Sequence, residues 1–439
     1  MNVGGASAPR PYKTALAWLY SLQQFGIKLG LDNIRRLITE LDVAPRAARV
    51  VHVAGTNGKG SVCAMIDSIC RAAKYRTGFF VSPHLVSFRE RIRVNGEMIS
   101  ENDVAAGLTT IRDLVRNWEP HPTFFEITTA LALKRFAEAG IDIAILETGL
   151  GGRLDATNAV QSAVSVITPI AFDHEKWLGD SLEKIAREKA GIIKAKTPVV
   201  SAPQQVPAEK VIRARAAECG SPLKFVEQPY TKSPLALRGE YQKLNAAIAI
   251  AAVEALKLDW LNPLSSAGAG IGIDDAAIGR GLARVEWPAR FQCWDKRTVI
   301  DGAHNPAAAK TLADSWSEVF ADERATIILA ALSDKDLRGI CQALAPIADS
   351  FLLPKIQTAR AVDPQELSKI LFSVCRPGAS PVGNRSGCPT ISVTKSFIEA
   401  LTDARARSNP ILITGSLHFA GEALAHLRGE PAAFEECEQ

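Results

Sequence analysis

Short runs of apolar, mostly β-branched residues alternate with segments of helical periodicity along the first part of the chain. Each run is continuously apolar, which is typical of strands that are covered on both faces. Strands that alternate with helices indicate parallel pairing through crossover connections. The pattern predicts a doubly wound α/β unit in which a helix ends near Lys74. Its predicted strands are 50–53, 79–81, 141–146 and 164–167.

The same rhythm restarts in the last third of the chain, after a helical segment at 233–259 and the dipeptide Trp287-Pro288. A chain of 439 residues also exceeds the roughly 250–300 residues at which single cores stop growing. We therefore predict two doubly wound α/β domains, at 1–295 and at 296–439, and a surface loop at the Gly-, Pro- and Ser-rich stretch 376–389. The predicted strands of the second domain are 298–300, 326–329, 351–353 and 411–413.

The composition is that of an ordinary globular protein, with 47% apolar residues, 22% charged residues and a net charge of +4. No block of like charges is present, which argues against a nucleic-acid partner. No apolar stretch approaches the roughly 20 residues of a membrane span, and residues 1–20 lack the apolar core of a secretory signal. Eight cysteines are scattered without zinc or disulfide spacing. We expect a cytoplasmic protein without a membrane partner.

One loop has the residue types that hold phosphate groups. The string GTNGKGS follows the strand at 50–53 and precedes a helical run that begins at Val62. Glycines let backbone N–H groups turn toward an anion, a helix N-terminus adds partial positive charge, and Lys59 can reach the β- and γ-phosphates. Val53 replaces the first glycine of the strict pattern, and a plain turn with a surface lysine is the alternative. The predicted triphosphate contacts are Gly55, Thr56, Asn57, Gly58, Lys59, Gly60 and Ser61.

The string GTNGKGS resembles the nucleotide loop of the Mur ligase superfamily, and later strings resemble its folate branch, the folylpolyglutamate synthase/dihydrofolate synthase family. Tyr241 and Ala289 depart from that pattern, because histidine and glycine are usual there. The resemblance implies an ATP- and folate-binding, P-loop domain of the Mur-ligase central type, followed by a smaller Rossmann-like glutamate ligase domain. The strings that carry it are SPHL at 82–85, ERIRV at 90–94, TFFE at 123–126, ETGLGGRLDATN at 147–158, DH at 173–174, EKAGI at 188–192 and DGAHNP at 301–306.

The resemblance also implies a ligase that uses ATP and two Mg²⁺ ions to join L-glutamate to a folate carboxylate through an acyl phosphate. A carboxylate is too unreactive for attack by an amine, so ATP activates it and Mg²⁺ neutralises the phosphates. The implied acceptor is 7,8-dihydropteroate, tetrahydrofolate or both, in a bifunctional enzyme that acts as a monomer. Two alternatives stay open: another Mur-type ligase, such as one for peptidoglycan precursors, and a nucleotide-dependent switch protein.

Glu147 ends the apolar strand at 141–146, at the edge where open parallel sheets collect their ligands. A glutamate that only caps a strand exit is the alternative. His174 resembles a ligand of the second Mg²⁺, although loop histidines are more often solvated or packed. Lys189 corresponds to a lysine that the family carbamylates, whereas most helix lysines are solvated. The implied metal ligands are Ser61, Ser82, Glu147 and His174, and the implied catalytic residues are Lys59, Glu147, His174 and Lys189.

By resemblance, Phe125 stacks on a pteridine ring, and a core phenylalanine before a helix at 126–139 is the alternative. Arg290 suits an anion with several oxygens, and DGAHNP precedes a helix at 307–320. Because both domains contribute, we expect domain closure to gate turnover. The strings DKD at 334–336 and GS at 415–416 belong to the cleft. The implied substrate contacts are Thr123, Phe125, Asp155 and Ala156, and the further nucleotide contacts are Asn245, Arg290, Asp301 and His304.

Overall fold

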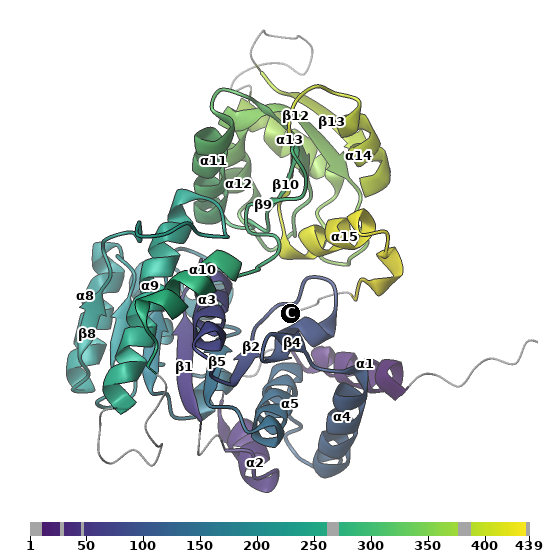
Figure 1. Ribbon diagram of the computed structural model, residues 1–439. Coiled ribbons are helices and arrows are strands. Elements are labelled where there is room, and N and C mark those ends of the chain that lie inside the picture. Colours follow the sequence, from purple (N-terminus) through teal and green to yellow (C-terminus); the bar gives the residue numbers. More distant parts are fainter. Residues whose placement is uncertain (1–10, 27–29, 45–47, 261–271, 376–387, 436–439) are drawn as a thin grey trace, which may run out of the picture.

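The computed structural model describes residues 11–26, 30–44, 48–260, 272–375 and 388–435. Within these residues the chain forms two α/β units, and the smaller unit lies above the larger one in Figure 1. Parallel strands dominate both sheets. The predicted fold class, two α/β domains in one chain, is confirmed.

The strands of the first sheet are β1 Arg49–Ala54, β2 Thr77–Phe80, β3 Ile92–Val94, β4 Glu97–Met98, β5 Ile143–Glu147, β6 Val164–Ile167, β7 Val199–Ser201 and β8 Leu223–Phe225. Their order is β4-β3-β2-β5-β1-β6-β7-β8. Pairing is parallel except at the edge formed by β3 and β4. The four predicted strands correspond to β1, β2, β5 and β6. The other four have two or three residues each, so they do not stand out as apolar runs.

Helices cover both faces of the first sheet (Figure 1). Alternate residues of a strand point to opposite faces: Ile143 and Ile145 of β5 pack in one core, while Ala144 and Leu146 pack in the other. Both cores are apolar, as the continuous runs predict. The helices of this domain are α1 Pro11–Ser21, α2 Asp32–Glu40, α3 Lys59–Ala72, α4 Glu101–Val115, α5 Phe124–Ala139, α6 Glu175–Leu178, α7 Leu182–Ala190, α8 Val206–Glu218, α9 Glu240–Trp260 and α10 Asp275–Arg284.

The second domain has the strands β9 Gln292–Cys293, β10 Thr298–Ile300, β11 Ala325–Leu329, β12 Ala348–Pro354, β13 Thr390–Thr394 and β14 Ile411–Thr414. Their order is β13-β12-β11-β14-β10-β9, and only β9 is antiparallel to its neighbour. Since β9 precedes residue 296, this sheet begins before the predicted boundary, which stays a prediction. The helices are α11 Pro306–Phe320, α12 Leu337–Leu344, α13 Pro364–Cys375, α14 Phe397–Arg405 and α15 Leu417–Leu427.

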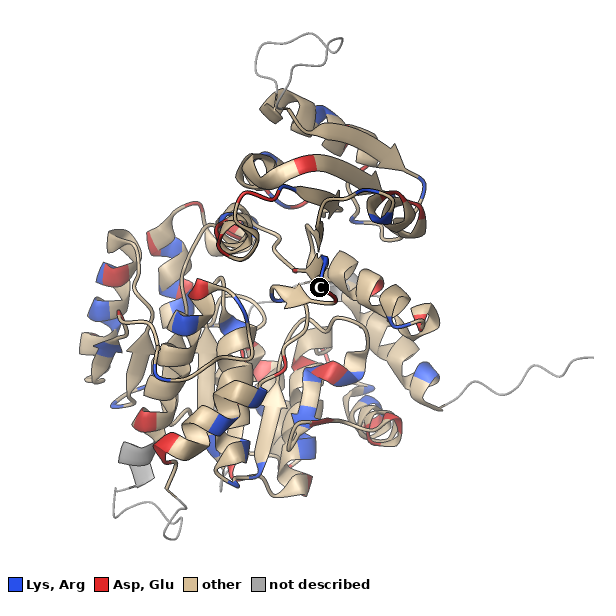
Figure 2. Cartoon of the chain, turned by 45° about the horizontal axis from the view of Figure 1, so that its top comes forward, with Lys and Arg blue, Asp and Glu red and all other residues tan. Residues whose placement is uncertain are grey.

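Acidic and basic residues lie interspersed over both domains (Figure 2). None of the described helices has the length and apolar character needed to cross a membrane. Seven cysteines in the described part of the chain are free, and Cys437 lies outside it. Most of the predicted loop at 376–389 also lies outside the described residues.

Ala289 lies in the connection between the domains and has a left-handed backbone, with φ 54°. Its carbonyl accepts hydrogen bonds from the Gly302 amide at 3.0 Å and from Arg290 Nη1 at 2.8 Å, so neighbours hold this conformation. For a residue with a Cβ, this left-handed conformation costs about 1–2 kcal/mol of conformational energy. We expect Ala289→Gly to raise the free energy of unfolding by about 1 kcal/mol, measured by urea denaturation.

The matched control is Ala283→Gly on the exposed face of α10. It is expected to lower stability by about 1 kcal/mol, because glycine is a poor helix former. If both substitutions destabilise equally, packing of the buried Ala289 methyl outweighs its backbone strain.

Candidate active site

The predicted phosphate loop connects β1 to α3. Gly55 has φ 151°, and a Cβ there would lie 1.9 Å from Thr168 Oγ1. Gly58 has φ 86° and is the N-cap of α3. Both positions require glycine, because a side chain would clash or strain the backbone. The loop leaves the N-terminus of α3 open, where backbone N–H groups and the helix dipole favour an anion.

Two lysines meet at the carbonyl of Gly55. Lys59 Nζ donates to this oxygen at 3.1 Å and to the Thr56 carbonyl at 3.1 Å. Lys189 Nζ, which comes from α7, donates to the Gly55 carbonyl at 2.8 Å. Burial, and next the charge of Lys59, lowers the pKa of Lys189 to about 7. A large fraction of Lys189 is therefore neutral near neutral pH, and Lys59 supplies the cation of the loop.

Glu147 and Ser82 lie at the carboxyl edge of the first sheet, after β5 and β2. Burial raises the pKa of Glu147 to about 7, although Lys59 and Arg290 oppose the shift. The backbone N–H of Ser82 donates to the Glu147 carboxylate. The Ser82 hydroxyl is buried and has no hydrogen-bond partner among the described residues. A buried carboxylate beside an unsatisfied hydroxyl suits a cation, because the cation would supply the partner that the Ser82 oxygen lacks and would balance the buried negative charge.

These oxygens fit Mg²⁺ in particular. Among the described residues, no three His, Cys, Asp or Glu side chains form a cluster that could hold a metal alone. Mg²⁺ does not need one, because it keeps several waters and binds phosphate oxygens together with one or two carboxylates. Ser61, in the first turn of α3, is also buried, and its hydroxyl accepts a hydrogen bond from Gln242 Nε2 at 3.3 Å. Glu147, Ser82 and Ser61 therefore form a suitable oxygen set.

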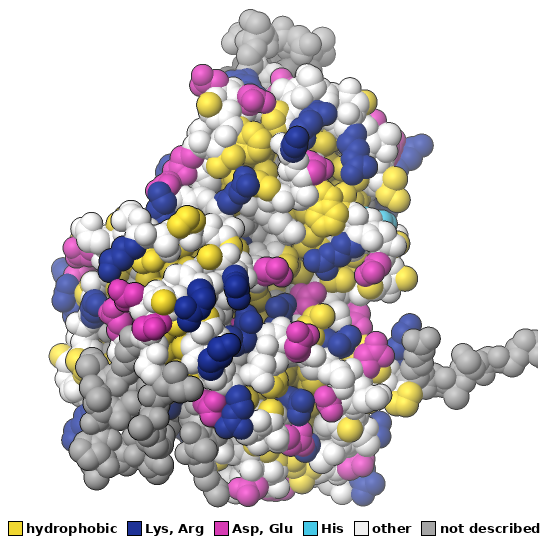
Figure 3. Space-filling view, in the orientation of Figure 1, with side chains coloured by type: hydrophobic (Ala, Val, Ile, Leu, Met, Phe, Trp, Pro, Cys, Tyr) yellow, Lys and Arg dark blue, Asp and Glu magenta, His cyan; other side chains and the backbone are white. Residues whose placement is uncertain are grey.

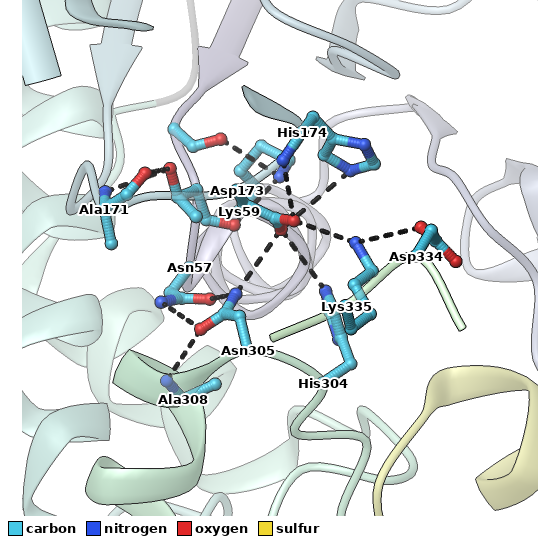
Figure 4. A network of polar contacts seen from close by, with 12 residues as sticks. Asn57, Lys59, Ala171, Asp173, His174, His304, Asn305, Ala308, Asp334 and Lys335 are labelled. Carbon is cyan, nitrogen blue, oxygen red and sulfur yellow. Dashed lines mark hydrogen bonds and ion pairs between the residues drawn. The ribbon is translucent and has the colours of Figure 1, made fainter. Parts of the chain in front are cut away.

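One carboxylate of the first domain lies among polar side chains of the second (Figure 4). Asp173 accepts hydrogen bonds from Lys335 Nζ at 2.8 Å and from Asn305 Nδ2 at 3.4 Å, and His304 Nε2 lies 3.7 Å away. Burial alone would raise the pKa of Asp173, but His174, Lys335 and His304 together hold it well below its usual value. Asp173 is therefore an anion that joins the two domains.

Asn305 extends this contact to the phosphate loop. Its Nδ2 donates to Asn57 Oδ1 at 3.0 Å, and its Oδ1 accepts from the Ala308 amide at 2.8 Å, which caps α11. The phosphate loop, Asp173 and the start of α11 thus form one connected network (Figure 4).

His174 follows Asp173 and has a left-handed backbone, with φ 53°. Its Nε2 lies 3.9 Å from Asp173 Oδ2. Burial lowers the pKa of His174 to about 4, although Asp173 opposes the shift. The imidazole is therefore neutral near pH 7, which is the form that binds metals.

An Asp173→Asn variant is expected to loosen the domain contact, because Lys335 would stay buried without its nearer counter-charge and would keep only Asp334, at 3.8 Å. Breaking a buried ion pair typically costs about 3–5 kcal/mol. The expected result is a larger radius of gyration by X-ray scattering and a lower thermal midpoint. Asp180→Asn is the control, because Asp180 pairs with Lys184 at an exposed position, where such pairs contribute about 0–1 kcal/mol. An unchanged radius and midpoint in Asp173→Asn would contradict this account.

Three of the four predicted substrate residues, Phe125, Asp155 and Ala156, lie in or against the loop at 149–157. A Cβ on Gly149 would lie 2.6 Å from Phe125 Cζ, so this ring lies against the loop. Ala156 is buried in the same apolar cluster that Phe125 contacts. The Asp155 carboxylate accepts hydrogen bonds from the amides of Gly149 and Leu150, both at 2.9 Å. Asp155 therefore shapes the loop.

Thr123 has a local role in the structure. Its hydroxyl donates to Glu126 Oε2 at 2.8 Å and accepts from the Glu126 amide at 3.3 Å, in a capping box at the start of α5. The same contact fixes the start of α5, and Phe125 is the second residue of this helix. A direct substrate contact of Thr123 stays a prediction.

The predicted nucleotide contacts of the second half face the same region. The Asp301 carboxylate accepts from the amides of Phe291 at 2.6 Å and Ala303 at 2.8 Å. Burial raises the pKa of Asp301, and Arg290 opposes the shift. Asn245 faces the phosphate loop, because a Cβ on Gly58 would lie 2.8 Å from Asn245 Oδ1. The structure thus places Asn245 beside the phosphate loop and Arg290 near Glu147 and Asp301, while the individual roles of these residues stay predictions.

Three residues of this cleft received no role from the sequence. Asp173 stood only in the DH string, Asn305 only in DGAHNP, and Lys335 was assigned only to the cleft. The sequence did offer one indication that these three residues belong to a site: each of them follows an apolar strand of its own domain. Their pairing joins residues 162 positions apart, which local patterns do not encode.

Two family descriptions match the chain: the Mur ligase middle domain at 53–221 and the Mur ligase glutamate ligase domain at 289–417. A dihydrofolate synthase/folylpolyglutamate synthase of Bacillus subtilis is 35% identical, over 95% of this chain and 99% of that protein. A protein of the same description from Escherichia coli is 33% identical over 94% of each chain.

Solved structures agree in fold. E. coli FolC in complex with DHPP and ADP has a TM-score of 0.82 and 30% identity, over 96% of this chain and 99% of that one. Mycobacterium tuberculosis folylpolyglutamate synthase with ADP and AMPPCP has a TM-score of 0.81 and 30% identity, over 98% of this chain and all of that one. The matched domains, the relatives that align over almost the whole chain and the solved structures all indicate the same family, which confirms the resemblance inferred from the motifs. The chain belongs to the dihydrofolate synthase/folylpolyglutamate synthase family of Mur ligases.

Proposed function

We propose that this chain joins L-glutamate to 7,8-dihydropteroate and to tetrahydrofolate, with ATP as the activating substrate, as a bifunctional dihydrofolate synthase/folylpolyglutamate synthase. The observation that carries the proposal is the network between the domains, in which Asn305 contacts Asn57 of the phosphate loop, and His304 and Lys335 contact Asp173. The relatives support it, since a structure of E. coli FolC holds DHPP and ADP, and a solved bifunctional folylpolyglutamate synthase/dihydrofolate synthase holds Mn, AMPPNP and L-glutamate.

In the proposed reaction, a carboxylate oxygen of the folate forms a bond to the γ-phosphorus of ATP while the bond to ADP breaks. The glutamate amine then attacks the acyl carbon, loses a proton, and phosphate leaves. Lys59 and the amides of the α3 N-terminus stabilise phosphate charge, and Arg290 adds a second cation from the facing side. Glu147, Ser82 and Ser61 would hold one Mg²⁺ and His174 would contact a second, and these ions would supply further charge neutralisation.

The pocket proposed for the pterin ring lies at the loop 149–157. Phe125 presents an aromatic ring against Gly149, and aromatic rings favour offset or edge contacts with flat heterocycles. Asp155 holds the loop shape through its backbone contacts. We also propose that the enzyme is a cytoplasmic monomer, which light scattering of the purified protein would test.

Lys189 has the properties required for carbamylation. The reaction needs a neutral amine, whose nitrogen attacks CO₂ and releases a proton, and the pKa of Lys189 is about 7. A carbamate would also replace repulsion between Lys189 and Lys59 by attraction. We expect a carbamate ¹³C resonance when the protein is incubated with labelled bicarbonate, and its loss in Lys189→Arg. Lys184→Arg, at an exposed position of the same helix, should keep the resonance, and a wild-type protein without it contradicts the proposal.

The deciding experiment offers each pterin acceptor separately to the purified protein with ATP, Mg²⁺ and labelled L-glutamate. Incorporation of label with both dihydropteroate and tetrahydrofolate, together with phosphate release, supports the bifunctional enzyme. Label with only one acceptor would reduce the proposal to a single activity. ATP hydrolysis without label in either product would overturn it.

A further inference from the structure

The segment that follows α15 returns from the second domain to the first. In Figure 1 it is the yellow segment that runs from α15 toward α1. A short helical turn at Pro431–Ala433 is followed by Phe434 and Glu435. The Phe434 ring packs edge-on against His418 of α15, with ring centroids 5.1 Å apart. Phe434 therefore keeps the segment on the second domain, while Glu435 bonds to residues of the first.

The carboxylate of Glu435 accepts hydrogen bonds from three groups of the first domain. Its Oε2 accepts from the Phe88 amide at 2.6 Å and from Ser87 Oγ at 3.1 Å. The Tyr12 hydroxyl of α1 lies 3.0 Å from Oε1 and 3.1 Å from Oε2. Hydrogen bonds to a charged acceptor are roughly twice as strong as those between neutral groups. The carboxylate therefore holds the end of the loop 82–88 beside α1.

The backbone of Glu435 holds the middle of the same loop. Its amide donates to the Val86 carbonyl at 2.7 Å. Its carbonyl lies 3.0 Å from His84 Nε2, and His84 Nδ1 accepts from Arg91 Nε at 2.8 Å. Because arginine only donates hydrogen bonds, His84 carries its proton on Nε2 and donates it to the Glu435 carbonyl. Side chain and backbone of one residue thus bind the loop at four of its positions.

Apolar packing places the loop 82–88 against the second domain as well. Val86 is buried in the apolar cluster to which α14 and α15 contribute. A Cβ on Gly421 of α15 would lie 1.9 Å from the Leu85 carbonyl oxygen, so the helix approaches the loop backbone closely. The second domain therefore contacts the loop from two sides, through α15 and through Glu435.

The donors to Glu435 are shielded, unlike the charges at the rim of the domain junction. Figure 3 shows acidic and basic side chains on the surface around this junction, where exposed pairs contribute little. Phe88 and Tyr12 are 0% and 6% exposed. A buried amide or hydroxyl that loses its acceptor is costly, and Glu435 supplies the acceptor to both.

Ser82 begins this loop, and its amide donates to the Glu147 carboxylate. The strand β2 ends at Phe80, just before Ser82, and Glu435 binds the loop just after it. We propose that Glu435 is a positioning residue, which keeps Ser82 Oγ in place for a divalent cation by holding the loop 82–88 against the second domain. The inference rests on the proposed function, because it uses the proposed metal role of Ser82.

The first test needs neither ligand nor turnover. In Glu435→Ala we expect the amides of 84–88 to exchange hydrogen about tenfold faster, the factor that loss of one hydrogen bond to a charged group gives. Peptides of the phosphate loop should exchange at the wild-type rate. Glu430→Ala is the matched control, because Glu430 is exposed in the same segment, and it should leave exchange at 84–88 unchanged. Wild-type exchange at 84–88 in Glu435→Ala would overturn the inference.

The second test measures AMPPNP binding by calorimetry, with excess Mn²⁺ and with EDTA. Metal binding weakens in proportion to the time that a loop spends out of its binding position. We therefore expect Glu435→Ala to lose several-fold in AMPPNP affinity with Mn²⁺ and to match the wild type in EDTA, which a general loss of structure would not do. Equal losses in both conditions would overturn the inference.

A double variant shows whether Glu435 acts through Ser82. Added to Ser82→Ala, Glu435→Ala should cause no further loss of Mn²⁺-dependent affinity, because residues that serve one contact are not additive. A full further loss would refute the role of Glu435. If Ser82→Ala itself keeps the wild-type affinity with Mn²⁺, the proposed metal site is refuted instead, and hydrogen exchange still decides whether Glu435 holds the loop.

Discussion

A Lys59→Ala protein is expected to lose about 10³-fold in kcat for glutamate ligation, the scale on which one positioned charge-stabilising group acts in catalysis. Lys59 is the cation that the loop itself provides, and its Nζ lies at the carbonyls of Gly55 and Thr56. Lys189 donates to the same Gly55 carbonyl from α7, but burial is the larger cause of its lowered pKa, so it would replace the lost charge only in part. The measurement is the initial rate of labelled glutamate incorporation at saturating ATP.

The control for this prediction is Lys210→Ala, because Lys210 is exposed on α8. It should ligate at the parental rate. The Lys59→Ala protein should keep its fold, which circular dichroism would check. Parental ligation by Lys59→Ala would mean that the triphosphate does not bind at this loop.

Glu147→Gln is expected to abolish most ligation and yet to stabilise the protein above neutral pH. The activity loss is about 10²–10³-fold, because the buried carboxylate is the charged member of the proposed Mg²⁺ set. In the protein without nucleotide or metal, however, the same buried carboxylate lowers the free energy of unfolding. Burial raises its pKa from 4.5 to about 7, so the folded state holds a proton that the unfolded state releases.

The sign of the pH dependence follows from this difference in proton binding. Stability of the wild type falls as pH rises from 4.5 to about 7, by roughly 3 kcal/mol from this group. Glutamine does not titrate, so the stability gain of Glu147→Gln should be small near pH 4.5 and largest above about pH 7. Urea denaturation of both proteins across this range measures the difference.

Glu227→Gln is the matched control, because Glu227 is exposed in a loop and its replacement should leave the pH dependence unchanged. If Glu147→Gln is no more stable than the wild type above neutral pH, the carboxylate is ionised at little cost and is more hydrated than its burial indicates. If it also ligates glutamate normally, Glu147 does not serve the metal.

The sequence by itself determined the parts of this protein that depend on local physics. Continuous apolar runs predict buried parallel strands, and β1, β2, β5 and β6 follow them. The phosphate loop was also predictable, since glycine at positive φ and a helix start are local features. The short strands β3, β4, β7 and β8 were not, because two or three residues show no period.

The tertiary structure alone decided which side chains meet across the two domains. Asp173, Asn305 and Lys335 form one contact, and the Ser82 hydroxyl is left without a partner. It also placed Glu435 against Ser87 and Phe88 of the first domain. The physical reason is that burial and charge proximity, which set the pKa values of Glu147 and Lys189, depend on distances in space. Residues far apart in the sequence, such as Lys59 and Glu147 or Lys59 and Lys189, produce those distances, and no pattern along the chain contains them.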